Sequence, residues 1–314
     1  MSLAFLFPGQ GSQAVGMGAA LADAFPSARL VFEEVDDALG QKLSQLMREG
    51  PDGDLTLTEN AQPALMAVSL AVVRALKAEF GVDVTQAAFV AGHSLGEYSA
   101  LAAAEALALT DTARLLKLRG QAMQRAVPVG EGAMASLIGP KADVALAEEA
   151  AKAGSELGVC VVANDNNAGN VVISGAKAAM DRAIEKAKEL GARAIPLNVS
   201  APFHSPLMAP AAEEMREALA STLISAPRTP LVANITARPT LDPEQVRALL
   251  VEQVTGRVRW RESIGWLAGE GGVTRFVELG AGKALTGMAK RIAPDAEALA
   301  LNTPEDLEAF AKTL

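Results

Sequence analysis

The chain has 314 residues, of which 50% are hydrophobic and 21% charged, and this length and composition predict a globular protein of two domains. Its 28 basic and 37 acidic residues give a net charge of −9, which argues against non-specific binding to nucleic acid. One cysteine and two histidines exclude an internal disulfide, a zinc ribbon and an HExxH site, so we expect no metal or cofactor and a reducing, cytoplasmic location.

Two further segments bear on location. The opening MSLAFLF has no basic residue before its apolar residues, so we expect no secretory signal. The longest charge-free stretch, residues 194–212, is interrupted by prolines, so we expect no membrane span and no membrane partner.

The first part of the chain alternates between apolar runs and helical patterns. A strand at 3–7 leads into the turn-rich PGQGSQ, and a strand at 87–91 leads into GHSLG. Helices are predicted at 28–39, 64–80, 97–107 and 111–126. This alternation indicates an α/β layer with a parallel sheet, which we expect to be α/β-hydrolase-like.

From residue 128 the elements become short, in the order βαββαβ of a ferredoxin-like domain. Strands are predicted at 133–138, 159–163, 171–174 and 193–199, helices at 141–153 and 176–190, and an Asn-rich turn at 164–170. After this insertion strands and helices alternate again, with strands predicted at 231–235 and 276–279 and a helix at 243–254. The predicted domains are therefore a large one, 1–127 with 200–314, and a small ferredoxin-like one, 128–199.

The strongest local signal is Gly92-His93-Ser94-Leu95-Gly96, placed between a predicted strand and a predicted helix. A G-x-S-x-G sequence in that setting is typical of a nucleophile elbow, a sharp turn that exposes the serine oxygen. The Leu95 amide at the helix start can then bind an oxyanion. The alternative is a chance match of a short pattern, but the strand-to-helix setting favours the functional interpretation.

A serine hydroxyl needs a base, and the chain offers two histidines. His93 adjoins Ser94 in a tight turn, where consecutive side chains point apart, so we expect it to support the elbow. His204 lies in the proline-bracketed loop APFHSP and is the better candidate base. A purely structural histidine is the alternative.

Arg119 is predicted to lie on the apolar stripe of its helix, because Leu115, Leu116, Ala122 and Met123 are three or four positions away. A cation there requires an anion. The anion is either a protein carboxylate or a substrate carboxylate, which a guanidinium can bind with two hydrogen bonds.

Two glycine-rich loops could indicate nucleotide binding. GQGSQA at 9–14 fits a degenerate dinucleotide fingerprint but lacks the second strand with its acidic end, and GAGK at 280–283 lacks the Walker serine or threonine and first glycine. Neither loop supports a nucleotide cofactor.

Seven motifs together resemble the malonyl-CoA:acyl carrier protein transacylase family of fatty acid synthesis, in the family's order and over nearly the whole chain. They are PGQGSQ (8–13), GHSLGEYSAL (92–101), LRGQAMQ (118–124), VISG (172–175), APFHSPLM (201–208), VRWRESI (258–264) and VELGAGKALTGM (277–288). Many relatives have a proline where this chain has Arg257, which puts the local loop shape in question.

The resemblance implies a role for each matching residue. Ser94 would carry the malonyl group as an ester, His204 would be its base, and the backbone carbonyl of Gln253 would orient His204. Backbone amides of Gln10 and Leu95 would form the oxyanion hole, and Arg119 would hold the free malonyl carboxylate. The implied partners are malonyl-CoA and acyl carrier protein, and we expect a monomer.

Other functions share these features. The same motifs would serve a malonyl transferase of a polyketide synthase or of malonate decarboxylase. A serine esterase or thioesterase would use the same elbow, although it usually carries its histidine near the C-terminus. A non-catalytic carrier-protein docking module is a further class, against which the intact Ser94, His204 and Arg119 argue.

Arg257, Arg259 and Arg261 alternate at period two, so they would share one face if the segment were extended. We consider two interpretations: a docking patch for the acidic carrier protein, or a solvated charged edge.

Overall fold

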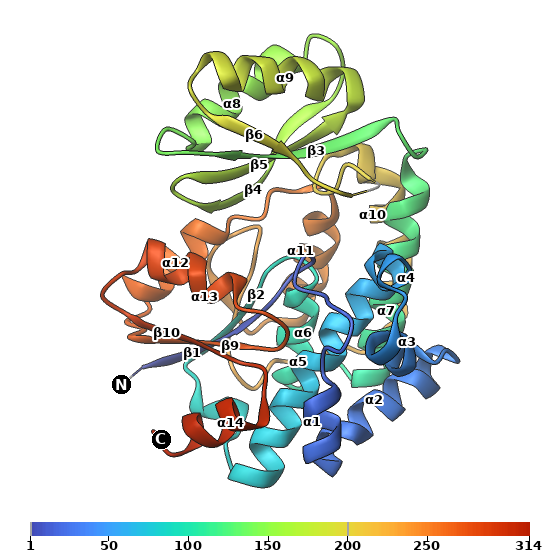
Figure 1. The fold of residues 1–314 in the computed structure, drawn as a ribbon, viewed down its shortest axis with the longest axis vertical. Helices are drawn as coiled ribbons and strands as arrows, with labels where there is room; N and C mark the ends of the chain where they lie inside the picture. Colours follow the sequence, from blue (N-terminus) through green and yellow to red (C-terminus); the bar gives the residue numbers. More distant parts are fainter. Residues whose placement is uncertain (1, 200) are drawn as a thin grey trace.

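The computed structural model describes residues 2–199 and 201–314. Met1 and Ser200, at which the two segments of the predicted large domain begin, lie outside the described residues. The chain forms two sheets, each covered by its own helices (Figure 1). The predicted fold class, an α/β domain with a parallel sheet and an inserted ferredoxin-like unit, is confirmed. The division at residues 128 and 199 stays a prediction.

The large sheet has the strand order β10-β9-β1-β2-β7-β8, and its first five strands run parallel. The short β8 pairs antiparallel with β7. The strands are β1 (Leu3–Phe7), β2 (Phe89–Gly92), β7 (Leu231–Val232), β8 (Pro239–Thr240), β9 (Arg275–Leu279) and β10 (Glu297–Leu301). Parallel strands bring their carboxyl ends to one edge, and the loops after β1 and β2, which carry Gln10 and Ser94, therefore meet there.

Helices cover both faces of this sheet, which explains why its central strands β1 and β2 carry no polar side chain. Phe5 and Phe7 of β1 pack in a core with α2, α5, α6, α7 and α14, whereas Ala4 and Leu6 pack on the other face with α12 and α13. The helices are α1 (Ala19–Ala24), α2 (Pro26–Leu39), α3 (Leu43–Glu49), α4 (Asp52–Thr56), α5 (Thr58–Phe80), α6 (Gly96–Ala103), α7 (Leu109–Ala126), α10 (Ala209–Ser221), α11 (Pro243–Thr255), α12 (Trp260–Ala268), α13 (Ala284–Ile292) and α14 (Pro304–Ala311). Across the described residues, no helix has the length and apolar composition to span a bilayer.

The small sheet is antiparallel, in the order β4-β5-β3-β6. Its elements are β3 (Gly132–Ile138), α8 (Val144–Gly154), β4 (Cys160–Asn167), β5 (Asn170–Ala176), α9 (Lys177–Glu189) and β6 (Arg193–Pro196). Alanine-rich faces of α8 and α9 pack on one side of this sheet, forming a core separate from that of the large sheet. Its other side faces the large unit (Figure 1).

Several element boundaries differ from the sequence predictions. The Asn-rich turn predicted at 164–170 is confined to residues 168–169, because β4 continues to Asn167 and β5 begins at Asn170. The polar side chains at the end of β4 are buried, and Asn166 contacts His93 of the large unit. The helix predicted at 64–80 begins six residues earlier, at Thr58, with Pro63 inside it. The strand predicted at 193–199 ends at Pro196, after which the chain lines a cavity.

Candidate active site

Ser94 lies in a tight turn between β2 and α6, as the motif predicts. Its φ of 54° is in the left-handed region, a strained conformation that occurs at nucleophile elbows. The flanking glycines explain how the turn fits. A Cβ at Gly92 would lie 1.9 Å from the Gly96 carbonyl oxygen, and a Cβ at Gly96 would lie 2.2 Å from the Phe7 carbonyl oxygen. The elbow therefore requires glycine on both sides.

Replacing Gly96 by alanine should lower the free energy of unfolding by about 2 kcal/mol or more, because the new methyl group would overlap backbone that cannot move independently. Gly265→Ala is the matched control. Gly265 lies inside α12 with nothing near its Cβ position, and alanine there should stabilise by up to about 1 kcal/mol. Chemical denaturation of both variants measures the contrast, and equal effects would contradict the packing argument.

His204 lies beside Ser94. The Ser94 Oγ to His204 Nε2 distance is 2.8 Å, and His204 Nδ1 is 2.9 Å from the Gln253 carbonyl oxygen. A carbonyl can only accept, so Nδ1 carries the proton and Nε2 accepts from the serine hydroxyl. The structure thus connects Ser94, His204 and the Gln253 carbonyl by two consecutive hydrogen bonds.

The environment of His204 keeps its imidazole neutral. Burial, reinforced by the nearby Arg119 cation, lowers the pKa of His204 to about 3. A neutral imidazole is the form that can take the serine proton.

Arg119 is 1% exposed, as its place on the apolar stripe predicts. Its Nη1 donates to Gln62 Oε1 at 2.8 Å, and its Nη2 donates to Gln253 Oε1 at 2.9 Å and to Ser94 Oγ at 3.1 Å. Its Nε has no hydrogen-bond partner. All three acceptors are neutral, so the ion-pair alternative considered for Arg119 is not what the described residues form. The guanidinium is thus held by neutral acceptors and has no carboxylate partner among the described residues.

The two amides proposed for the oxyanion hole lie at the same cavity. Leu95 immediately precedes α6, at the positive end of the helix dipole, and Gln10 follows β1. The Gln10 side chain is held by the Thr58 hydroxyl, which donates to its Oε1 at 2.9 Å. Both residues line the cavity beside Ser94. Their role in binding an oxyanion stays a prediction.

The cavity has a volume of about 390 Å³ and lies between the two sheets. The large unit contributes Ser94, Arg119 and His204, and the small unit contributes Met134 and Asn164. Its wall combines these polar groups with the apolar side chains of Leu95, Met123 and Phe203, as is usual for a small-molecule site.

His93 joins the two units at the elbow, in agreement with the predicted supporting role. Its Nε2 donates to Asn166 Oδ1 of β4 at 2.9 Å, and its ring packs edge-on against Trp260, 5.5 Å between centroids. Burial lowers the pKa of His93, so it is neutral.

Sequence reasoning missed three polar residues of the site. Asn234 accepts the Ser94 N–H at 2.8 Å and donates to the Gly92 carbonyl at 2.7 Å, thereby pinning the elbow. Gln62 Oε1 accepts from Arg119 Nη1. Glu97 accepts from the side-chain amide of Gln253, whose oxygen in turn accepts from Arg119. Of the three, only Asn234 is an isolated polar residue in an apolar run, LVANI, which was an available signal.

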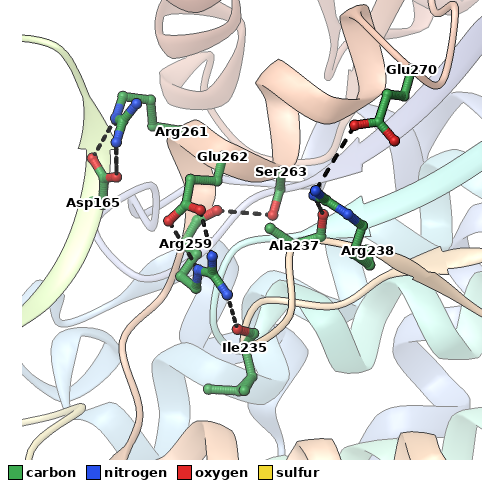
Figure 2. Close-up of polar contacts among 9 residues, drawn as sticks. All are labelled: Asp165, Ile235, Ala237, Arg238, Arg259, Arg261, Glu262, Ser263 and Glu270. Atoms are coloured by element: carbon green, nitrogen blue, oxygen red, sulfur yellow. Dashed lines mark hydrogen bonds and ion pairs between the residues drawn. The ribbon is translucent and has the colours of Figure 1, made fainter.

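The arginines at 257, 259 and 261 do not form the predicted shared face, because α12 begins at Trp260 and the segment is not extended. Each guanidinium has a carboxylate of its own chain: Arg257 with Glu148 at 2.7 Å, Arg259 with Glu262, and Arg261 with Asp165 at 2.8 Å. Figure 2 shows the last two pairs, with Asp165 reaching across from β4. The shared extended face is therefore not formed, and the docking-patch interpretation stays untested. Arg257 and Arg261 tie the small unit to the large one.

Comparisons with known proteins agree with this geometry. A sequence profile of the acyl transferase domain matches residues 4–295. The malonyl CoA-acyl carrier protein transacylase of Bacillus subtilis (strain 168) is 45% identical over 313 residues, which cover 99% of this chain and 97% of the relative. The crystal structure of the acyl-carrier-protein-S-malonyltransferase from Bartonella henselae superimposes with a TM-score of 0.96 at 55% identity, covering 100% and 99% of the two chains. A malonyl-transacylase in complex with a type II PKS acyl-carrier protein gives a TM-score of 0.96 at 39% identity over 100% of both chains.

Proposed function

This chain belongs to the acyl transferase domain family, and we propose that it transfers the malonyl group of malonyl-CoA to the thiol of acyl carrier protein, supplying fatty acid synthesis. The observation that carries the proposal is the pair of contacts made by Ser94 Oγ. It lies 2.8 Å from the base His204 and 3.1 Å from a buried arginine without a carboxylate partner. The proposed base, His204, and the proposed carboxylate-binding residue, Arg119, therefore both contact the oxygen of the proposed nucleophile, Ser94.

In the first half-reaction, Ser94 Oγ attacks the thioester carbon of malonyl-CoA while its proton passes to His204 Nε2. The amides of Gln10 and Leu95 stabilise the oxyanion of the tetrahedral intermediate. When the intermediate collapses, the carbon–sulfur bond breaks and His204 returns the proton to the departing CoA sulfur. The product is a malonyl ester on Ser94, with His204 neutral again.

The second half-reaction repeats these steps in reverse. The pantetheine thiol of acyl carrier protein gives its proton to His204 Nε2 and attacks the ester carbonyl. The carbon–oxygen bond to Ser94 then breaks, and His204 protonates the serine oxygen. The Gln253 carbonyl holds the histidine in the required tautomer throughout.

The position of Arg119 accounts for selection of a short diacid. Once the acyl group is on Ser94 Oγ, its free carboxylate lies two carbon atoms from that oxygen, within reach of the guanidinium now 3.1 Å away. Nη2 and the unpartnered Nε lie on the same side of a guanidinium. When Nη2 exchanges its bond to Ser94 Oγ for one to the substrate, the two nitrogens can bind two carboxylate oxygens. An acetyl group makes no such contact.

Incubating the protein with malonyl-CoA and carrier protein tests the function. Mass spectrometry should find one malonyl group on carrier protein that bears pantetheine and none on carrier protein without it. A serine thioesterase would instead release free malonate and leave the carrier unloaded. Running a fatty-acid and a polyketide carrier protein side by side separates the two pathway contexts.

At saturating malonyl-CoA, the rate of Ser94 acylation should stay constant from pH 8 down to pH 5. The reason is that His204, with its pKa lowered to about 3, stays unprotonated over that whole range. Rapid-quench measurement of malonyl-enzyme formation checks this. A half-maximal rate near pH 6.5, the ordinary pKa of histidine, would show that the imidazole is not held neutral.

A cytoplasmic location completes the proposal. It is supported by the single cysteine, Cys160, which is buried as a free thiol in the core of the small unit.

A further inference from the structure

Glu97 is a buried carboxylate that the mechanism above does not use. It lies in the first turn of α6, three residues after the nucleophile, and is 1% exposed. Its Oε2 accepts from Gln253 Nε2 at 2.7 Å and from the Asn234 N–H at 3.2 Å. Both donors are neutral, although a buried carboxylate is ordinarily paired with a cation.

The Gln253 amide connects this carboxylate to Arg119. Gln253 Nε2 donates to Glu97 and also to the Ser94 carbonyl at 2.9 Å, so the other end of the amide, Oε1, is turned to Arg119 Nη2 at 2.9 Å. Glu97 thereby determines which end of the amide faces the guanidinium. With the amide reversed, an NH2 group would face the cation and the contact would be lost.

We propose that Glu97 is a positioning residue and the buried counter-ion of Arg119, acting through the Gln253 amide, and that it takes up a proton when a substrate carboxylate binds Arg119. The inference rests on the proposed function, because it assumes that the acyl group carries such a carboxylate.

The charge balance of the site leads to the proton uptake. In the empty site the positive charge of Arg119 and the negative charge of Glu97 sum to zero, and each group acts on the other electrostatically. Burial already raises the pKa of Glu97 to about 7. A bound carboxylate adds a second buried negative charge and neutralises Arg119, whose positive charge otherwise lowers the pKa of Glu97. The pKa of Glu97 therefore rises further. Around pH 8, binding should therefore protonate Glu97.

Other charged groups near α6 do not supply this proton linkage. Strands β1 and β2, which pack against α6, contain no titratable residue. Burial raises the pKa of Tyr98 to about 12 and lowers the pKa values of His93 and His204. The charged residues of α5 and α7 other than Arg119 have partners elsewhere. Ion pairs join Glu59 with Lys117, Arg74 with Glu34, Lys77 with Asp83, Arg114 with Asp111, and Arg125 with Glu214. Glu79 is exposed and accepts from the Ser27 hydroxyl. Helix α11, which carries Gln253, contains Glu244, Arg247 and Glu252, none of which is buried.

Calorimetry at pH 8, in buffers of different ionisation enthalpy, counts the protons directly. The protein carries Ser94→Ala so that malonyl-CoA binds without reacting. We expect uptake approaching one proton per malonyl-CoA bound, and none with acetyl-CoA, which has the same CoA but no carboxylate. Adding Glu97→Gln, whose amide oxygen can accept from the same two donors, should abolish the uptake. Adding Glu278→Gln, a change in another buried glutamate that caps α13, should leave it intact.

Steady-state kinetics gives a second readout on protein with Ser94 intact. The KM for malonyl-CoA should rise between pH 6.5 and 8.5, by up to about tenfold per pH unit above the Glu97 pKa, and should be flat in Glu97→Gln. A merely structural role would not produce this difference. Absence of proton uptake with malonyl-CoA, or equal uptake with Glu97→Gln, would overturn the inference even if that variant folds poorly. Failure of protein with Ser94 intact to acquire a malonyl group would instead overturn the proposed function.

Discussion

Ser94→Ala should lower kcat/KM for malonyl transfer by about 10⁴-fold or more, because Ser94 Oγ is the hydroxyl that His204 can deprotonate to accept the malonyl group. His204→Ala should lose a similar factor, and the double variant should lose little more than either single one, since the two residues act as one unit across a 2.8 Å contact. Transfer of radiolabelled malonyl groups to carrier protein is sensitive enough to measure such residual rates.

Ser99→Ala provides the matched control for this prediction. Ser99 lies in the same helix that follows the elbow, and its buried hydroxyl has no hydrogen-bond partner. Its removal should leave transfer unchanged within about twofold. Multiplicative losses in the Ser94 and His204 double variant would contradict the relay, because independent residues would then be acting on separate steps.

Arg119→Ala should remove the preference for malonyl over acetyl thioesters. Losing a buried guanidinium from a carboxylate costs about 3–4 kcal/mol, or roughly two to three orders of magnitude in kcat/KM for malonyl-CoA. The acetyl rate should change much less, because acetyl makes no contact with the guanidinium. Arg119→Lys should recover only part of the loss, since an ammonium cannot bind both carboxylate oxygens in the same plane.

Arg114→Ala on the same helix is the control for Arg119, because its side chain is exposed and distant from the cavity residues. Competition between the two thioesters, with both products quantified by mass, gives the ratio directly. Equal losses for malonyl and acetyl in Arg119→Ala would mean that the arginine supports the elbow rather than the carboxylate.

The sequence was sufficient to predict the elbow, the histidine beside it and the buried arginine, because each depends on a short pattern. Ser94 is marked by its glycines, His204 by the scarcity of histidine, and Arg119 by its position on an apolar stripe. The structure places His204 and Arg119 within hydrogen-bond distance of Ser94 Oγ. The βαββαβ order of the small unit was similarly readable from its periodic apolar runs.

What sequence reasoning missed depends on contacts between distant segments. Asn164 to Asn167 have the composition of a turn, yet they continue β4 because the large unit buries their side chains and supplies His93 as a partner. The resemblance implied the Gln253 carbonyl, but the side-chain amide that joins Glu97 to Arg119 became visible only in three dimensions. For Arg257, Arg259 and Arg261, sequence reasoning predicted a shared face that the structure does not form. The local spacing of the arginines could not indicate that Glu148 and Asp165, from a distant segment, pair with two of them.

The central claim is that Ser94 carries a malonyl group between two thiols. Its most direct test is the intact mass of the protein after brief exposure to malonyl-CoA without carrier protein, followed by fragmentation of the modified peptide. We predict one malonyl group per chain, located on Ser94, absent from Ser94→Ala and discharged on addition of carrier protein. A malonyl adduct that persists in Ser94→Ala, or transfer to carrier protein without any adduct on Ser94, would contradict the account.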